Sequence, residues 1–272
     1  MRKIVGISNG NRVVDEFNNY ELKNIDAEIV KLTNKENPNF LFLSHALSEE
    51  EEEREFFEIG LIYSNMFNCN CMLLKKEDLE NGTDVKSLVD WADIIYAAGT
   101  DTLNLVYLWK KTGFDKILED AYNDGKVMCG ASSGASCWFN SCITEALRII
   151  YNDQNKPLVG MNCLSFIDLF CIPHGNSMER YIDSKDLLKR NNKVGLLLSS
   201  PTSIEIVDDK YRILCGDSKF RDNKVIPFAL KMYWDEDRYI EEAIDLSDEF
   251  KSLSSLLKKS KKDKKEKVYK KV

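Results

Sequence analysis

Residues 127–139 read Val-Met-Cys-Gly-Ala-Ser-Ser-Gly-Ala-Ser-Cys-Trp-Phe, and the fold prediction starts from this segment. It places the pattern Gly-x-Ser-x-Gly, with Ser132 at its centre, directly after an apolar strand-like run and directly before a segment predicted to be helical, 133–139. In that setting the two glycines let strand and helix approach closely around a strained turn, which exposes the serine at the carboxyl end of the sheet. We therefore predict an α/β fold with Ser132 as a nucleophile. Ser133 as the reactive serine, or a Ser-Gly-rich turn without chemistry, are the alternatives.

The segments around this motif alternate between strand and helix. Apolar runs predict strands at 4–7, 40–43, 71–74, 93–97 and 127–129, and the intervening patterns predict helices at 49–67, 85–91 and 117–124. Strands separated by helices form parallel βαβ units, and short apolar strands suit a sheet covered on both faces. Later strands are predicted at 169–172, 194–198, 203–207, 211–214 and 232–234, with a hairpin turn at Asp208–Asp209 and a terminal helix at 240–257.

Composition and charge limit the classes of protein that fit. The chain has 272 residues, 43% hydrophobic and 31% charged, as is ordinary for a globular protein, and we predict a single α/β domain over 1–257. Residues 258–272 form a lysine-rich tail, predicted to be solvated, so the net charge of −7 rests on an acidic body, which argues against nucleic acid as a partner. No apolar run approaches the roughly 18 residues of a membrane span, and residues 1–5 lack the residue pattern that predicts a signal peptide. We predict a cytoplasmic protein with no membrane partner, and the sequence leaves a homodimer open.

The cysteines and glycines give no sign of a metal or a cofactor. Eight cysteines occur without a repeated Cys-x-x-Cys, and the chain has two histidines, so a zinc site is not predicted and the thiols are interpreted as reduced, buried hydrophobes. The dinucleotide-binding pattern G-x-G-x-x-G does not follow the first predicted strand, and there is no phosphate-binding loop of the Walker type. We therefore predict no metal and no cofactor.

A serine nucleophile needs a base and a site for the oxyanion. His174 follows the predicted strand 169–172, and His45 follows the strand ending at residue 43, so both lie at strand ends, where the active sites of α/β sheets gather. This placement favours His174 but leaves His45 as an alternative. The amide of Ser133 is one predicted oxyanion donor, and the loop at Gly99, which follows the strand 93–97, is the second.

At this point the chain resembles a known family, the dipeptidase E (aspartyl dipeptidase) family of serine peptidases, in its bacterial peptidase E-like branch. Residues 130–139 are similar to the family's G-x-S-A-G-A-x-C-W-F turn, and residues 95–102 to its I-x-x-G-G-G-N-T segment. Pro173 and His174, followed by Arg180, resemble its histidine segment. The resemblance implies a three-layer α/β/α sandwich with a mostly parallel central sheet, like the class I glutamine amidotransferase domains, and serine-type hydrolysis of short peptides.

The resemblance also implies roles for individual residues. Ser132 is the nucleophile and His174 the base, Gly99 and Ser133 form the oxyanion hole, and Thr100 and Arg180 contact the substrate. The acidic triad member of the family falls on Ser200 here, so Ser200, Glu205, Glu179 and Asp183 are the candidates for a third member. The short segment between His174 and Arg180 does not support a preference for amino-terminal aspartate.

Two departures from the family pattern support a competing interpretation. Ser200 replaces the expected acid, and Asp101 replaces an asparagine beside the oxyanion site, where an inward carboxylate would oppose developing negative charge. A catalytically impaired binding or sensing domain is therefore the alternative function, and an ester hydrolase is a third.

Overall fold

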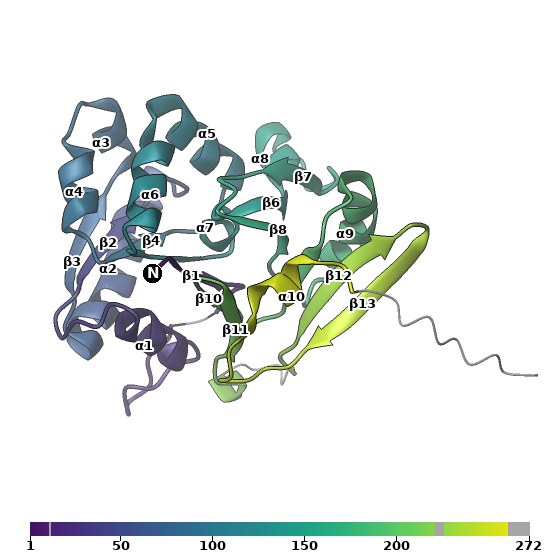
Figure 1. Ribbon diagram of the computed structural model, residues 1–272. Coiled ribbons are helices and arrows are strands. Elements are labelled where there is room, and N and C mark those ends of the chain that lie inside the picture. The colour runs from purple at the N-terminus through teal and green to yellow at the C-terminus, as the bar shows by residue number, and fades with distance from the viewer. Residues whose placement is uncertain (11, 221–225, 261–272) are drawn as a thin grey trace, which may run out of the picture.

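The structure, a computed structural model, describes residues 1–10, 12–220 and 226–260. Within these residues it contains an eight-stranded sheet and a six-stranded sheet with helices packed on them (Figure 1). The strands of the larger sheet are β1 (Lys3–Ile7), β2 (Asn39–Leu43), β3 (Asn70–Leu74), β4 (Ile94–Ala97), β5 (Val127–Ala131), β10 (Thr202–Val207), β11 (Lys210–Cys215) and β14 (Lys251–Ser252). Those of the smaller sheet are β6 (Phe139–Thr144), β7 (Val159–Asn162), β8 (Ile167–Ile172), β9 (Gly195–Leu198), β12 (Ala229–Asp235) and β13 (Arg238–Ile244). The helices are α1 (Lys23–Lys31), α2 (Glu49–Phe67), α3 (Lys76–Glu80), α4 (Val85–Trp91), α5 (Thr102–Thr112), α6 (Phe114–Asn123), α7 (Ser133–Ser136), α8 (Ala146–Tyr151), α9 (Met178–Asn191) and α10 (Leu253–Leu257), with a 3₁₀ turn, η1 (Ser218–Phe220).

The order of the larger sheet puts the Ser132 motif near its middle. The strands run β14-β11-β10-β1-β5-β4-β2-β3, and β1, β5, β4, β2 and β3 are mutually parallel. β10 is antiparallel to β1, and β11 and β14 continue antiparallel beyond it. Because β5 lies between two parallel neighbours, the residue that follows it emerges at the carboxyl edge of the sheet, between the ends of β1 and β4.

Alternate residues of the central strands pack against two different helical layers. Ile4, Leu41 and Met128 belong to a core shared with α4, α5 and α6. Their strand neighbours Val5 and Phe40 belong to a second core, shared with α1 and α2. Successive side chains of a strand point to opposite faces of the sheet, so the larger sheet is the middle layer of an α/β/α sandwich, which confirms the predicted fold class.

The smaller sheet was not predicted as a separate unit. Its order is β13-β12-β9-β8-β6-β7, with β6, β8 and β9 parallel. On one face Phe170 and Ile172 pack with Leu188 of α9, whereas Cys171 and Leu198 join the core of α4–α6 in the larger sheet. The two sheets therefore share a hydrophobic core, which brings the end of β8 toward the end of β5.

Most predicted elements agree with the structure, and two do not. α2 and α4 span the predicted residues, and β10 and β11 form the predicted hairpin about Asp208 and Asp209. The helix predicted at 133–139 is the single turn α7, after which residue 139 enters β6. The helix predicted at 240–257 is wrong over most of its length, because 238–244 pairs with β12 as β13 and only 253–257 is helical.

Of the lysine-rich tail, only residues 258–260 are described. There the Lys259 ammonium donates to Asn192 Oδ1 at 2.7 Å, and the amide of Ser260 donates to the hydroxyl of Tyr233 at 3.2 Å. The prediction of a solvated tail otherwise falls on residues 261–272, outside those described. Among the described helices, none combines the length and the apolar character that crossing a membrane requires.

Candidate active site

The Ser132 turn is strained in the way that the sequence predicts. Ser132 follows β5 with φ 56° and ψ −114°, a region that a residue with a side chain seldom adopts. Its amide donates to the carbonyl of Ile7 at the end of β1 at 2.9 Å, which fixes the turn against the neighbouring strand. Such backbone strain costs on the order of 1–3 kcal/mol and is concentrated at functional sites.

Glycine is required where α7 crosses β4. A Cβ atom on Gly134 would overlap the carbonyl oxygen of Ala97 and lie 2.8 Å from that of Ala98. The obstructing atoms belong to backbone within the sheet, so they cannot move aside as the end of a flexible side chain could. This contact explains the second glycine of the motif.

Gly134→Ala is therefore expected to destabilise the protein by at least about 3 kcal/mol, because overpacking against fixed backbone displaces the turn or the strand. Urea unfolding of the purified variant, followed by circular dichroism, measures the effect. Gly60→Ala is the matched control: Gly60 lies inside α2, its added Cβ would come no closer than 3.5 Å to Phe56, and alanine is the better helix former. An unchanged midpoint for Gly134→Ala would mean that this close approach does not constrain the turn.

The structure brings Ser132 together with His174. Ser132 Oγ lies 2.7 Å from Nε2 of His174, which is hydrogen-bond distance. His174 comes two residues after β8 and has φ 59°, a left-handed conformation that is uncommon for a residue with a side chain. Serine and imidazole at this separation are the arrangement of an activated nucleophile and its base.

Gly99 and Ser133, the two predicted oxyanion donors, lie next to Ser132. A Cβ on Gly99 would lie 3.2 Å from Cβ of Ser132 and 2.7 Å from the carbonyl of Ala131, so the Gly99 backbone passes directly beside the serine. Ser133 is the first residue of α7, and the first amides of a helix have no partner inside it. The Ser133 hydroxyl donates to the carbonyl of Thr100 at 3.0 Å and accepts from Thr102 Oγ1 at 2.9 Å, so it ties this loop to the Ser132 turn.

Asp101, which lies beside this loop, is the amino-terminal cap of α5. Its carboxylate accepts from the amides of Leu103 and Asn104 at 3.0 and 3.1 Å and caps the amino terminus of α5. The Asn104 side chain donates to the second carboxylate oxygen at 2.6 Å. The carboxylate is therefore turned toward the helix it caps.

The alternative histidine, His45, lies in the core. It is 3% exposed, its Nδ1 accepts from Trp109 Nε1 at 2.8 Å, and the rings of Trp109 and Phe114 stand edge-on to it. Burial lowers the pKa of His45 from its ordinary 6.5 to about 3, because the charged imidazolium is excluded from water. The structure thus places His174, and not His45, at Ser132.

The buried His45 predicts a loss of stability on acidification. The unfolded chain takes up a proton below about pH 6.5, whereas the folded chain does so only near pH 3, so the free energy of unfolding falls as the pH drops between these values. From pH 7.5 to pH 5 the expected loss from this residue is about 2 kcal/mol. Urea unfolding at both pH values measures it, and His45→Gln, which cannot titrate, is expected to lose less between them. Equal losses in the two proteins would contradict the assignment.

The candidates for a third triad member have other contacts. The buried carboxylate of Glu205 on β10 pairs with Nε of Arg212 at 2.8 Å, and Glu179 at the start of α9 pairs with Arg148. Ser200 is buried in the loop after β9, where its amide donates to Oδ1 of Asn176 at 2.6 Å. Glu205 and Glu179 are therefore occupied by arginines, and Ser200 contacts the segment that follows His174.

The two predicted substrate contacts lie in different surroundings. Thr100 lines the same cavity as Ser132. Arg180 donates to Oε1 of Glu145 at 2.5 Å, and its side chain is 11% exposed. The structure thus brings Thr100 to the site, whereas the Arg180 side chain on α9 pairs with Glu145, the residue that precedes α8.

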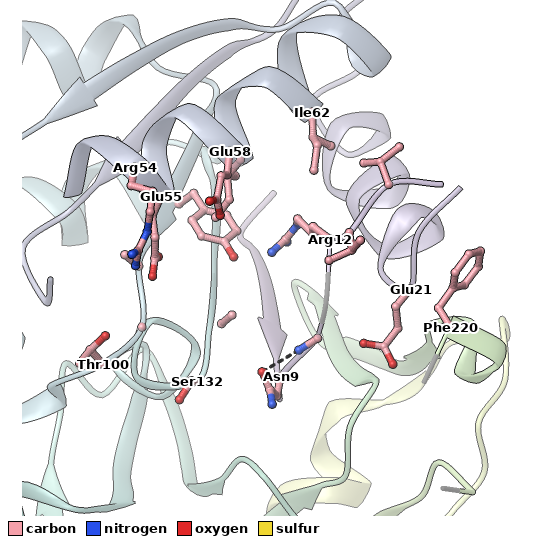
Figure 2. Close-up of a pocket in the computed structure, with 18 of the residues that line it drawn as sticks. Asn9, Arg12, Glu21, Arg54, Glu55, Glu58, Ile62, Thr100, Ser132 and Phe220 are labelled. Atoms are coloured by element: carbon pink, nitrogen blue, oxygen red, sulfur yellow. Dashed lines mark hydrogen bonds between the residues drawn. The ribbon is translucent and has the colours of Figure 1, made fainter. Parts of the chain in front are cut away.

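Ser132 lies at the floor of an open cavity of about 1460 Å³ (Figure 2). One wall is α2, whose Arg54, Glu55 and Glu58 side chains point into the cavity in Figure 2. Burial and the nearby Glu51 raise the pKa of Glu55. No sequence motif on α2 marks this wall, because only the packing of α2 on the sheet places these side chains at the cavity.

The cavity is also lined by Arg12, which forms a buried ion pair with Asp26 that no sequence motif marks. Arg12 donates through Nε and Nη2 to the two carboxylate oxygens of Asp26, each at 2.7 Å. Asp26 also accepts from the hydroxyls of Tyr20 and Tyr63 at 3.0 and 2.9 Å. The guanidinium stands over the ring of Tyr96 at 5.5 Å from its centroid. Arg12 is thus fixed from several sides, and its charge is matched by a carboxylate in contact with it.

A serine on a strained strand-to-helix turn, with a histidine within hydrogen-bond distance of it, is an arrangement that recurs in serine hydrolases of unrelated folds. Residues 7–214 match peptidase family S51, and the chain belongs to that family. This membership confirms the resemblance to the dipeptidase E family and supports peptidase activity.

Three similar proteins carry related descriptions. The uncharacterized peptidase YgaJ of Bacillus subtilis (strain 168) is 28% identical over 174 residues, which are 64% of this chain and 69% of the relative. The crystal structure of a peptidase from an acI-B1 Actinobacterium has a TM-score of 0.66 at 16% identity and covers 93% of this chain and 97% of its own. A protein of Listeria monocytogenes EGD-e described as "putative Peptidase E" has a TM-score of 0.56 at 18% identity, over 79% and 98% of the two chains. At these identities the two structures show the shared fold.

Proposed function

We propose that this chain is a serine-type peptidase that hydrolyses short peptides through an acyl-enzyme on Ser132, with His174 as general base. The single observation that carries the proposal is the 2.7 Å separation of Ser132 Oγ and His174 Nε2 on a strained turn that opens into a cavity. Backbone strain of this kind, present at Ser132 and in the left-handed conformation of His174, is concentrated at functional sites and supports the proposal.

Peptide hydrolysis follows from this pair in two stages. Ser132 Oγ attacks the scissile carbonyl carbon while its proton passes to Nε2 of His174. Collapse of the tetrahedral adduct breaks the C–N bond, and the imidazolium gives its proton to the leaving amine. A water molecule then attacks the remaining ester with His174 as base, which releases the acid and restores the Ser132 hydroxyl.

The charge that develops on the carbonyl oxygen needs donors already in place. We assign these to the amides of Gly99 and Ser133, because the Gly99 backbone passes beside Ser132 and Ser133 begins α7. Thr100, in the cavity next to Gly99, is assigned to substrate contact. We assign neither Glu205 nor Glu179 to the pair, since both are bound to arginines.

Labelling with a fluorophosphonate probe tests the proposal directly, because the probe forms a stable phosphonyl ester with an activated serine. We expect the folded protein to gain one phosphonyl group, located on Ser132 by peptide mass spectrometry, and to cleave members of a panel of dipeptides and tripeptides. Heat-unfolded protein is the control for non-specific reaction. A folded protein that neither takes up the probe nor cleaves any peptide of the panel would falsify the proposal and favour a binding or sensing domain.

A further inference from the structure

The end of β1 holds both members of the proposed pair. The carbonyl of Ile7 accepts the amide of Ser132 at 2.9 Å, and the hydroxyl of the next residue, Ser8, accepts the amide of His174 at 2.9 Å. Ser132 and His174 are 42 residues apart in the chain, and Ser8 is 166 residues from His174. Ile7 and Ser8, which are neighbours at the end of β1, therefore fix the positions of Ser132 and His174 relative to each other.

Ser8 is itself held in a fixed orientation. It is fully buried, its amide donates to the carbonyl of Thr202 at 2.9 Å, and its hydroxyl donates to the carbonyl of Leu198 at 2.6 Å. A serine hydroxyl has one proton to donate and lone pairs left to accept. With its proton directed at Leu198, its oxygen is available to the amide of His174.

The backbone of His174, which Ser8 contacts, is in a strained conformation. His174 has φ 59°, and a residue with a side chain keeps a left-handed conformation only where the surrounding structure imposes it. We infer that Ser8 is a positioning residue, which keeps the His174 imidazole within hydrogen-bond distance of Ser132 through the His174 backbone. This inference rests on the proposed role of His174 as base.

The rest of the His174 loop has attachments that do not depend on Ser8. The amide of Gly175 donates to the carbonyl of Leu198 at 2.8 Å, and Oδ1 of Asn176 accepts the amide of Ser200 at 2.6 Å. The carbonyl of His174 also accepts the amide of Ser177 at 2.8 Å. Removal of the Ser8 hydroxyl therefore leaves the loop on the sheet and takes away the acceptor that holds the amide of His174. A folded protein with a displaced base is the expected consequence.

Ser8→Ala is expected to lower kcat for a cleaved peptide by about 10²-fold with KM nearly unchanged, because a base displaced by about 1 Å impairs the chemical step and leaves substrate binding intact. The rate of Ser132 phosphonylation should fall by a similar factor. Ser203→Ala is the matched control. Ser203 is fully buried on β10 opposite Ile7, and its hydroxyl has no hydrogen-bond partner among the described residues. That variant should keep the wild-type kcat.

A double-mutant cycle separates positioning from general damage. If Ser8 acts through His174, Ser8→Ala should slow phosphonylation about 10²-fold in the wild type and hardly at all in a His174→Ala background. Equal factors in the two backgrounds, or a wild-type kcat for Ser8→Ala, overturn the inference. If the alanine variant does not fold, Ser8→Cys, whose sulfur is a weaker acceptor, is compared in the same cycle. If the proposed function itself is wrong, the result differs from these outcomes: Ser132→Ala and His174→Ala would then leave peptide cleavage unchanged.

Discussion

Ser132→Ala is expected to lower kcat/KM for peptide cleavage by at least about 10³-fold, because the substitution removes the only atom of the site proposed to form a bond to the substrate. The residual rate should come from the oxyanion donors and from binding, which persist when a nucleophile is lost. Steady-state kinetics on the best substrate of the peptide panel measures the change. Phosphonylation by the fluorophosphonate probe should disappear in the same variant.

The fold of this variant is expected to remain intact. Alanine adds no atoms to the turn, and the hydrogen bond from the amide of Ser132 to Ile7 does not involve the side chain. The urea midpoint should therefore stay close to that of the wild type. The control is Ser141→Ala on β6, which removes another buried serine hydroxyl, one without a hydrogen-bond partner among the described residues. If Ser132→Ala keeps a tenth or more of the wild-type kcat/KM, another residue is the nucleophile.

The parts of this site that could be predicted from sequence are those that depend on neighbouring residues. The Ser132 turn is set by a strand, two glycines and a helix start within about a dozen residues, and their spacing alone indicates the strain that the structure shows. His174 could be predicted because the chain has two histidines, each after a predicted strand. The capping role of Asp101 was not predicted, although aspartate directly before a helix is a common start signal.

The parts that could not be predicted depend on contacts between distant segments. Ser8 lies 166 residues from His174, and no local pattern marks a serine that holds a distant backbone. Arg12 lines the cavity only because it pairs with Asp26 of α1 and stands over the ring of Tyr96 on β4. The helix predicted at 240–257 failed for a related reason. Ile240 and Ile244 fit a helical period as well as a strand period, and pairing with β12 decides between them.

His174→Gln is the second substitution with a large expected effect, a fall in kcat of about 10³- to 10⁴-fold. Glutamine retains polar atoms near the position of the imidazole but cannot accept the Ser132 proton at neutral pH. The remaining reaction then depends on hydroxide to remove that proton. The rate of the variant should therefore rise about tenfold for each pH unit in the range where the folded protein is stable. Cleavage rates of wild type and variant across that range measure this slope.

His45→Gln is the control that separates the two histidines. It removes the hydrogen-bonding imidazole from the core beside Trp109, so the free energy of unfolding should change, whereas kcat per folded molecule should not. Phosphonylation of Ser132 supplies the count of folded sites. The assignment of His174 is wrong if His174→Gln takes up the probe at the wild-type rate, or if His45→Gln has the lower kcat per labelled site. In the expected outcome, the histidine that follows β8 governs the rate and the histidine near β2 governs the stability, as their contacts with Ser132 and Trp109 require.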